Sequence, residues 1–158
     1  MSNILITYFS ASGVTAKVAK NMAELIGADT FEIIPKQKYT EADLNWHDKK
    51  SRSSIEMENK LSRPEIEGTV SKLHDYNIVM IGFPVWWYTA PTIINTFIES
   101  LDLTGKTLIP FCTSGITGIE GCEKDLREMY PKYNWKNGKR LNGKEDKEFL
   151  EKWIEEEK

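Results

Sequence analysis

The stretch Ser10-Ala11-Ser12-Gly13-Val14-Thr15 combines three hydroxyl side chains with one glycine. It lies between a short apolar run at 4–9 and a segment at 14–26 whose apolar residues recur at helical spacing. A tight turn from a strand into a helix directs several backbone N–H groups and the positive end of the helix dipole at one point. We therefore expect this loop to hold an anion, most simply a phosphate. An ordinary turn, in which Ser12 or Thr15 only caps the helix, is the alternative.

The composition of this loop restricts the kind of phosphate that it can bind. No Gly-Lys-Ser or Gly-Lys-Thr sequence follows, as a nucleoside triphosphate loop would require. One glycine is fewer than a dinucleotide fingerprint contains. Residues 10–15 also lack the cysteine nucleophile of a cysteine-dependent phosphatase. What remains is a neutral cradle of the hydroxyls of Ser10, Ser12 and Thr15 and of backbone amides, suited to a terminal monophosphate that is held and not transferred.

A second loop, 84–90, contains three large aromatic side chains in the sequence Pro84-Val85-Trp86-Trp87-Tyr88. A flat π-electron ligand can stack on such rings, and each aromatic contact contributes about 0.5–1.5 kcal/mol beyond the area that it buries. The simpler role is packing against the helix that begins near Pro91, and we expect one of the two tryptophans to take it.

A third loop, 113–118, carries Thr113, Ser114, Gly115 and Gly118. Glycine lets a main chain approach a neighbour closely, so the amides of this loop are candidates for contacts with polar ring atoms. A simple flexible turn would have the same composition.

The segments around these loops alternate between strand and helix patterns. Apolar, β-branched runs predict strands that are buried on both faces, and apolar residues at helical spacing predict amphipathic helices. We expect Pro35 to end the second strand. The predicted strands are 4–9, 30–34, 78–83, 107–113 and 133–135; the predicted helices are 14–26, 91–101, 119–129 and 149–154, with helical turns around 41–47, 51–61 and 70–73.

Five strands alternating with helices predict an α/β fold with a parallel sheet covered on both faces and right-handed crossovers. In such sheets, ligands bind beyond the carboxyl ends of the strands, where the strand order reverses. With the order 2-1-3-4-5, the loops 10–15, 84–90 and 113–118 leave strands 1, 3 and 4 at that edge. Their convergence is the main argument from the residues for a binding site.

Length and composition fit one domain spanning 1–158, because 158 residues with 40% hydrophobic and 28% charged side chains are typical of a soluble globular protein. No apolar run approaches the roughly 20 residues that a membrane helix needs. No secretory signal is visible, so a cytoplasmic location is expected. The net charge of −3, with both signs interspersed, indicates neither a nucleic-acid footprint nor a membrane-binding face. Two cysteines, Cys112 and Cys122, do not make a disulfide framework. We expect Cys112 to lie at the buried end of a strand and Cys122 to lie in a helix.

A monophosphate at the first loop and a planar ring at the other two describe flavin mononucleotide (FMN). The sequence resembles the flavodoxin family, specifically the branch with a Pro-x-Trp-Trp loop after the third strand and a Thr-Ser-Gly loop after the fourth. The matching segments are 8–15, 82–91 and 111–119, with weaker likeness at 63–66 and 138–143. The resemblance implies a flavodoxin-like three-layer sandwich, non-covalent FMN, and electron transfer through the flavin.

The resemblance also implies roles for residues. Loop 10–15 would bind the FMN phosphate, segment 84–88 would cover one side of the isoalloxazine, and segment 113–118 would contact its pyrimidine edge. The implied FMN-binding residues are Ser10, Ala11, Ser12, Gly13, Val14, Thr15, Pro84, Val85, Trp86, Trp87, Tyr88, Thr113, Ser114, Gly115 and Gly118. No catalytic side chain and no metal ligand is assigned. The chain departs from well-known flavodoxins in having Ile116 and no aromatic in the third loop, and in being only mildly acidic.

None of the three loops contains Lys or Arg, so we expect little stabilisation of an anionic reduced flavin and a low reduction potential. The leading functional expectation is a small electron carrier that exchanges electrons with a reductase and an acceptor protein, as a monomer or weak dimer. The alternative is an FMN-dependent NAD(P)H oxidoreductase that acts on quinones or similar acceptors, with segment 36–68 as a substrate lid. A non-catalytic module that binds a phosphate ligand is the third possibility.

Overall fold

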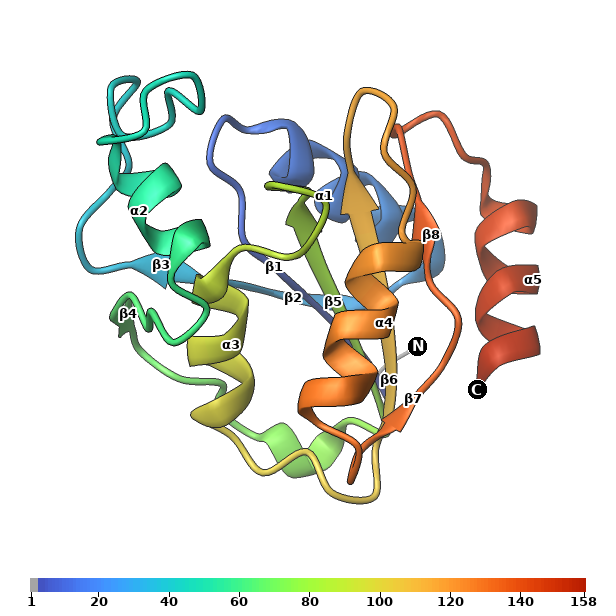
Figure 1. Ribbon diagram of the computed structural model, residues 1–158. Coiled ribbons are helices and arrows are strands. Elements are labelled where there is room, and N and C mark those ends of the chain that lie inside the picture. The colour runs from blue at the N-terminus through green and yellow to red at the C-terminus, as the bar shows by residue number, and fades with distance from the viewer. Residues whose placement is uncertain (1–2) are drawn as a thin grey trace.

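The apolar runs of the sequence form the middle of a parallel sheet (Figure 1), in which five strands follow one another and a sixth, β8 (Lys139–Arg140), also pairs with β6. The structure is a computed structural model that describes residues 3–158, so the first two residues of the expected domain lie outside it. The sheet order is β2-β1-β5-β6-β7, and each neighbouring pair is parallel. This confirms the predicted order 2-1-3-4-5. The strands are β1 (Ile4–Tyr8), β2 (Asp29–Glu32), β5 (Ile78–Pro84), β6 (Thr107–Thr113) and β7 (Asn134–Trp135).

Helices cover both faces of this sheet, as predicted (Figure 1). α1 (Val14–Ile26) and α5 (Lys147–Glu157) pack on one face, and α3 (Thr92–Glu99) and α4 (Glu120–Met129) on the other. Smaller elements are α2 (Arg52–Glu58), the 3₁₀ turn η1 (Leu73–Asp75), β3 (Ile34–Pro35), β4 (Ile66–Glu67) and β8 (Lys139–Arg140). Within residues 3–158, none of the helices has the length and apolar character needed to cross a bilayer.

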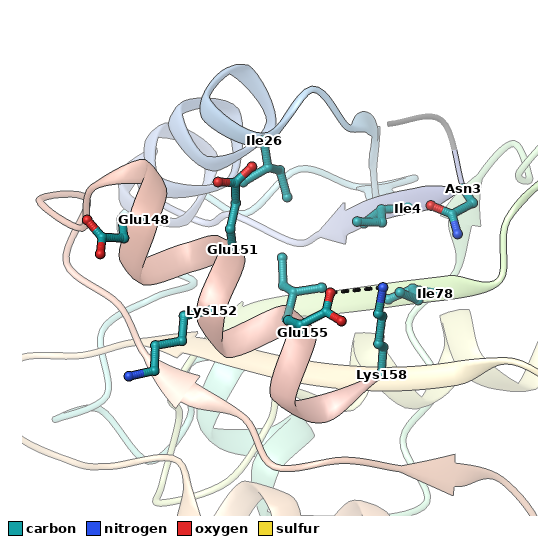
Figure 2. Close-up of a pocket in the computed structure, with 10 residues that line it drawn as sticks. Asn3, Ile4, Ile26, Ile78, Glu148, Glu151, Lys152, Glu155 and Lys158 are labelled. Atoms are coloured by element: carbon teal, nitrogen blue, oxygen red, sulfur yellow. Dashed lines mark ion pairs between the residues drawn. The ribbon is translucent and has the colours of Figure 1, made fainter.

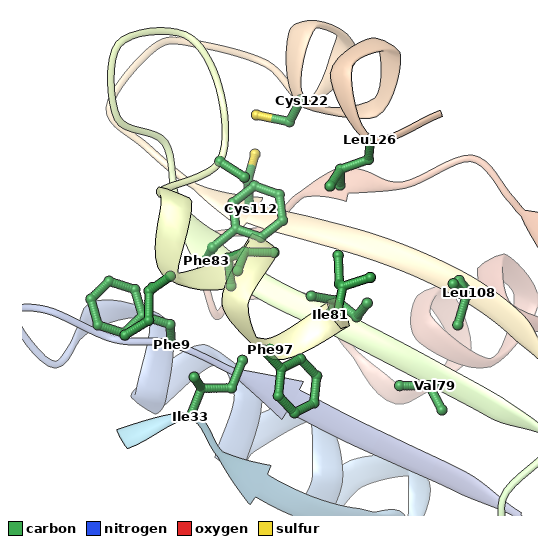
Figure 3. Packing of buried hydrophobic residues seen from close by; sticks show 14 of the residues in the cluster. Phe9, Ile33, Val79, Ile81, Phe83, Phe97, Leu108, Cys112, Cys122 and Leu126 are labelled. Atoms are coloured by element: carbon green, nitrogen blue, oxygen red, sulfur yellow. The ribbon is translucent and has the colours of Figure 1, made fainter. Parts of the chain in front are cut away.

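The central strands supply two separate apolar cores because successive side chains of a strand point to opposite faces. In β5, Val79, Ile81 and Phe83 pack under α3 and α4, whereas Ile78 and Met80 pack under α1 and α5. The continuous apolar run of this strand is therefore the mark of burial on both faces. Figure 3 shows the first of these cores around Phe83 and Phe97.

Both cysteines lie in the core under α3 and α4 (Figure 3). Cys112 is in β6 and Cys122 is in α4, as expected, and both side chains are fully buried free thiols. Burial raises the pKa of each thiol to about 12.

The second strand differs from its prediction. It ends at Glu32, and Pro35 does not terminate a strand but belongs to one: Ile34 and Pro35 pair antiparallel with Glu67 and Ile66 as a separate two-stranded sheet. The last ladder pair of β1 and β2 is Tyr8 with Glu32, and Ile33 N–H still donates to Tyr8 C=O at 2.7 Å. The chain leaves the main sheet after Ile33, and Ile34 is the first residue that pairs with β4. The region around 41–47 makes a single helical turn, with Leu44 N–H donating to Thr40 C=O at 3.1 Å.

The fifth sheet position is also more complex than the predicted strand 133–135. β7 and β8 both pair parallel with β6, Trp135 opposite Leu108 and Lys139 opposite Phe111. Between these two pairs, the chain advances four residues from Trp135 to Lys139, while β6 advances three residues from Leu108 to Phe111. The segment from β7 to β8 therefore contains one extra residue, as in a β-bulge. Gly138 lies at this point, where a Cβ would sit only 2.0 Å from the Pro110 carbonyl oxygen.

We predict that Gly82→Ala strongly destabilises the fold. Gly82 pairs with Phe111 in the sheet, and a Cβ on Gly82 would lie 2.1 Å from the buried Phe111 ring. Overpacking of this kind typically lowers the free energy of unfolding by about 1–3 kcal/mol. Urea denaturation measures the change. Gly115→Ala, where a Cβ meets open space, is the matched control and should change stability by less than about 0.5 kcal/mol; equal effects of the two variants would refute the packing argument.

We also predict that neither cysteine reacts with iodoacetamide in the folded protein at pH 8. With pKa values raised to about 12 by burial, both groups stay protonated at this pH, and the thiolate is the reactive form. Mass spectrometry should show two modified cysteines after unfolding in urea and none before it. Rapid labelling of either residue in the native protein would contradict this assignment.

Candidate functional site

Three loops meet at the carboxyl edge of the sheet because β5 and β6 end opposite each other, at Pro84 and Thr113, and β1 ends opposite Gly82, two residues earlier. Phe9 N–H donates to Gly82 C=O at 3.0 Å, and Val85 N–H donates to Thr113 C=O at 3.1 Å. Figure 1 shows the three loops, 10–13, 84–90 and 113–118, at the same end of the molecule. The predicted convergence is thus present in the structure.

The first loop is shaped by Ser10. Its Oγ accepts hydrogen bonds from Gly13 N–H at 3.1 Å and from Ala16 N–H at 3.0 Å, across the start of α1. Gly13 is the N-cap and has φ = 96°, a left-handed conformation that favours glycine. The helix is therefore not capped by Ser12 or Thr15, as the ordinary-turn alternative assumed.

This arrangement leaves hydrogen-bond donors at the start of α1. The first-turn N–H groups of Val14 and Thr15 have no acceptor within the helix. Ser12, Gly13 and Val14 are exposed, and Ala11 is half-buried. The Ser10 hydroxyl accepts two bonds and keeps its own proton to donate. An anion at this point would meet amides and hydroxyls and no charged side chain of the loop itself.

Thr15 links the first loop to the third. Its side chain is 1% exposed, and its Oγ1 lies 2.7 Å from Thr113 Oγ1 across 98 positions of sequence. One of these hydroxyls donates to the other, so the start of α1 is joined directly to the end of β6.

The second loop is a two-residue turn in a strained conformation. Trp86 and Thr89 exchange backbone hydrogen bonds of 2.9 and 3.0 Å, and Trp87 and Tyr88 between them have φ values of 50° and 67°. Asn-Gly is the usual choice at these two positions, because side chains are disfavoured at positive φ. α4 holds the turn: Thr89 Oγ1 donates to Asp125 Oδ2 at 2.6 Å, and Gly121 leaves room for the Tyr88 carbonyl.

This turn separates the roles of its aromatic side chains. Trp86 is half-buried and packs edge-on to Phe9 and Tyr39, at centroid distances of 5.7 and 5.4 Å. Trp87 and Tyr88 are 45% and 77% exposed. Trp86 is therefore the tryptophan with a packing role, and Trp87 and Tyr88 are free to meet a ligand or partner.

The third loop is ordered by side chains from inside and outside it. The Ser114 hydroxyl donates to the Thr117 carbonyl. Gly115 and Ile116 are exposed, and the guanidinium of Arg140 donates to Gly115 C=O at 3.2 Å. Arg140 belongs to β8, an element that the sequence did not predict, so this contact was missed.

A cavity of about 580 Å³ opens beside the second and third loops. This volume is within the range of small-molecule sites. Each of its nine described lining residues is uncharged, and most are apolar or aromatic. They are Leu44, Trp46, Ser53, Met57, Val85, Trp86, Trp87, Tyr88 and Thr117.

Four of the lining residues, Leu44, Trp46, Ser53 and Met57, come from the long connection between β3 and β4. In the sequence, Leu44, Trp46 and Met57 are isolated apolar residues of a polar connection, and no local pattern says which part of the sheet such a connection covers. Trp46 is 66% exposed, so it stands at the mouth of the cavity.

Tyr39 attaches this connection to the site. Its hydroxyl donates to Glu56 Oε1 at 2.5 Å, and the Arg52 guanidinium lies 3.9 Å from its ring centroid while Arg52 Nε bonds Glu56 at 2.9 Å. Burial, followed by the bond to Glu56, raises the pKa of Tyr39 well above its usual value. Tyr39 therefore stays neutral and acts as a fixed contact between α2 and Trp86.

A cavity of about 490 Å³ lies at the opposite end of the sheet (Figure 2). It lies under α5, with Ile4 and Ile78 at the start of β1 and β5 and with Glu155 paired to Lys158 at 2.9 Å. The amino edge of a parallel sheet is not where ligands bind in this class of fold. Among residues 3–158, no group of three His, Cys, Asp or Glu side chains is arranged to hold a metal ion.

Comparison with solved structures supports the fold assignment. Crystal structures of candidate flavoproteins from Bacteroides eggerthii and Bacteroides uniformis are 44% and 50% identical to this chain, with TM-scores of 0.94 and 0.90. The first match covers 97% of this chain and 96% of the other, and the second 98% of both. A flavoprotein from Lactobacillus acidophilus, solved in complex with FMN, has the same fold at 23% identity and a TM-score of 0.73, covering 96% of this chain and 98% of that one.

Comparison with curated proteins gives no match. The sequence profile of the flavodoxin family matches residues 3–157, nearly the whole chain. Together with the sheet order and the loops at its carboxyl edge, this match shows that the chain belongs to the flavodoxin family.

Proposed function

We propose that this protein binds FMN non-covalently and acts in electron transfer through it. The observation that carries the proposal is that a neutral loop with free helix-terminal amides and an uncharged, aromatic-lined cavity of about 580 Å³ occupy the same edge of the sheet. A monophosphate fits the first feature and a neutral ring system fits the second. The Lactobacillus acidophilus flavoprotein with this fold was solved in complex with FMN, which agrees with the assignment.

The phosphate would be held at residues 10–15. The amides of Val14 and Thr15 are the free donors of the first helical turn, and the hydroxyls of Ser10, Ser12 and Thr15 add further donors. The positive end of the α1 dipole favours the negative charge. The phosphate serves here as an anchor, since residues 10–15 include no general base that would activate their hydroxyls as nucleophiles.

The ring would be held by the second and third loops, with the long connection as a further wall. Trp87 and Tyr88 offer exposed aromatic faces, and Gly115 and Gly118 let backbone amides come close to polar ring atoms. FMN supplies the electron-transfer chemistry, and the protein controls access of water and partners to it. The Pro-x-Trp-Trp and Thr-Ser-Gly loops would thus be the ring-binding motifs of this branch. The residues so assigned are Pro84, Val85, Trp86, Trp87, Tyr88, Thr113, Ser114, Gly115 and Gly118.

A carrier is the leading form of this function, with separate reductase and acceptor proteins as redox partners. The uncharged cavity lining supports it, because nothing in that lining would pair with the phosphates of a pyridine nucleotide. An FMN-dependent reductase of quinones or similar acceptors is the second candidate. It is favoured by one observation: the connection carrying Trp46 and Met57 walls the cavity, as a substrate lid would.

We predict that the purified protein is yellow or takes up FMN after removal of bound cofactor. Absorption spectra and mass analysis of the released cofactor identify it. Because the phosphate is held by its own loop, FMN should bind at least about tenfold more tightly than riboflavin, since hydrogen bonds to a charged group contribute about 1.5–3 kcal/mol. A protein that binds neither flavin would overturn the proposal.

Thr15→Ala should weaken FMN binding by about 10- to 100-fold, the effect of losing one hydrogen bond to a charged group. The reduction potential of the bound flavin should stay nearly unchanged, because the phosphate is remote from the redox centre. Fluorescence titration gives the affinity and spectroelectrochemistry the potential.

Thr15→Ser, which keeps the hydroxyl, is the matched control and should retain most of the affinity. An equal loss of riboflavin affinity in Thr15→Ala, or a shifted potential with unaltered FMN affinity, would show that Thr15 does not act through the phosphate.

The rate of NADPH oxidation in the presence of a quinone distinguishes an electron carrier from a reductase. Rapid oxidation of NADPH by the protein alone in the presence of a quinone is the result expected of a reductase. Reduction only after addition of a separate flavodoxin reductase is the result expected of a carrier, which we predict.

A further inference from the structure

Two charged side chains from outside the third loop lie at its two ends. Arg140 of β8 donates to Gly115 C=O at 3.2 Å. Glu120, in the first turn of α4, lies so close to Gly118 that a Cβ there would be 2.3 Å from its Oε2. The loop itself carries no charged residue, so these two contacts bring one basic and one acidic side chain against it.

β8 brings Arg140 to this place. Arg140 pairs with Cys112 in the parallel ladder, and Leu141 N–H donates to Cys112 C=O at 2.9 Å. The ladder therefore fixes the backbone of Arg140 beside the last residues of β6, immediately before the third loop. Burial raises the pKa of Cys112, near the end of β6, to about 12. The charge of Arg140 acts against this rise and the charge of Glu120 adds to it, so both side chains act electrostatically on the end of β6.

We propose that Arg140 and Glu120 set the reduction potential of the flavin in opposite directions. The proposal rests on the proposed function, because it requires FMN beside the third loop. Reduction adds negative charge to a flavin, so a nearby guanidinium favours the reduced form and a nearby carboxylate disfavours it. The expectation of little stabilisation of the reduced flavin was drawn from the residues of the three loops alone, and it omits Arg140.

The experiment measures the potential of FMN bound to the variants Arg140→Gln and Glu120→Gln. Arg140→Gln should make the potential more negative and Glu120→Gln more positive. Both side chains are exposed, so each effect should be about two- to fivefold in the ratio of affinities for reduced and oxidised FMN. For a two-electron couple this corresponds to about 10–20 mV.

Lys139→Gln is the matched control. It removes the same charge from the adjacent residue of β8, whose side chain points to the other face and lies 5.5 Å from the Phe149 ring. It should leave the potential unchanged. Arg140→Lys keeps the charge and should retain most of the wild-type potential. The Gln amide can still donate to Gly115 C=O, so a shift in Arg140→Gln that is absent from Arg140→Lys reports the charge.

Thermal unfolding of all variants shows whether the fold is preserved. If FMN binds and the potentials of Arg140→Gln and Glu120→Gln equal those of the wild type and of Lys139→Gln, the inference is wrong while the proposed function stands. If no variant and no wild-type protein binds FMN, both are overturned.

Discussion

The parallel register of β1, β5 and β6 is the constraint on which the candidate site depends. These parallel strands end within two residues of one another, so the loops that follow them occupy one edge of the sheet. The hydroxyl contact between Thr15 and Thr113 then joins the first loop to the third across 98 positions of sequence. A slip of one residue in either ladder would turn every side chain of the slipped strand to the opposite face and separate these contacts.

In the second loop, contacts with the surrounding structure stabilise a backbone conformation that is unfavourable for side-chain-bearing residues. Trp87 and Tyr88 adopt positive φ values that cost non-glycine residues about 1–2 kcal/mol each. The backbone bonds between Trp86 and Thr89, the bond from Thr89 to Asp125, and the space at Gly121 hold the turn in place. The result is two exposed aromatic side chains on a fixed turn, which suits contact with a flat ligand better than packing in the core.

The charge distribution of the site follows from the same architecture. The cavity lining and the phosphate loop are neutral, so an anion is met by amides and hydroxyls, and a ring by apolar and aromatic side chains. Charged side chains lie next to the third loop, Arg140 on β8 and Glu120 on α4, and both are exposed to solvent. In the proposed function, the neutral lining holds the ring and the charged side chains at the rim adjust its reduction potential.

Local sequence patterns predicted the main strands, the four long helices and the three loops. This was possible because a strand that is buried on both faces and an amphipathic helix are each recognised from residues that are close together in the sequence. The alternation of strands and helices, together with the resemblance to flavodoxins, predicted the order of the sheet. That order in turn predicted that the loops after strands 1, 3 and 4 lie at one edge. The local patterns did not predict β3 and β4, the Ser10 cap, the cavity wall at Leu44, Trp46, Ser53 and Met57, or Arg140 beside Gly115. Each of these is a contact between segments far apart in sequence or a capping geometry across a turn. Only the folded chain decides such contacts, because packing of the whole molecule selects which distant side chains meet.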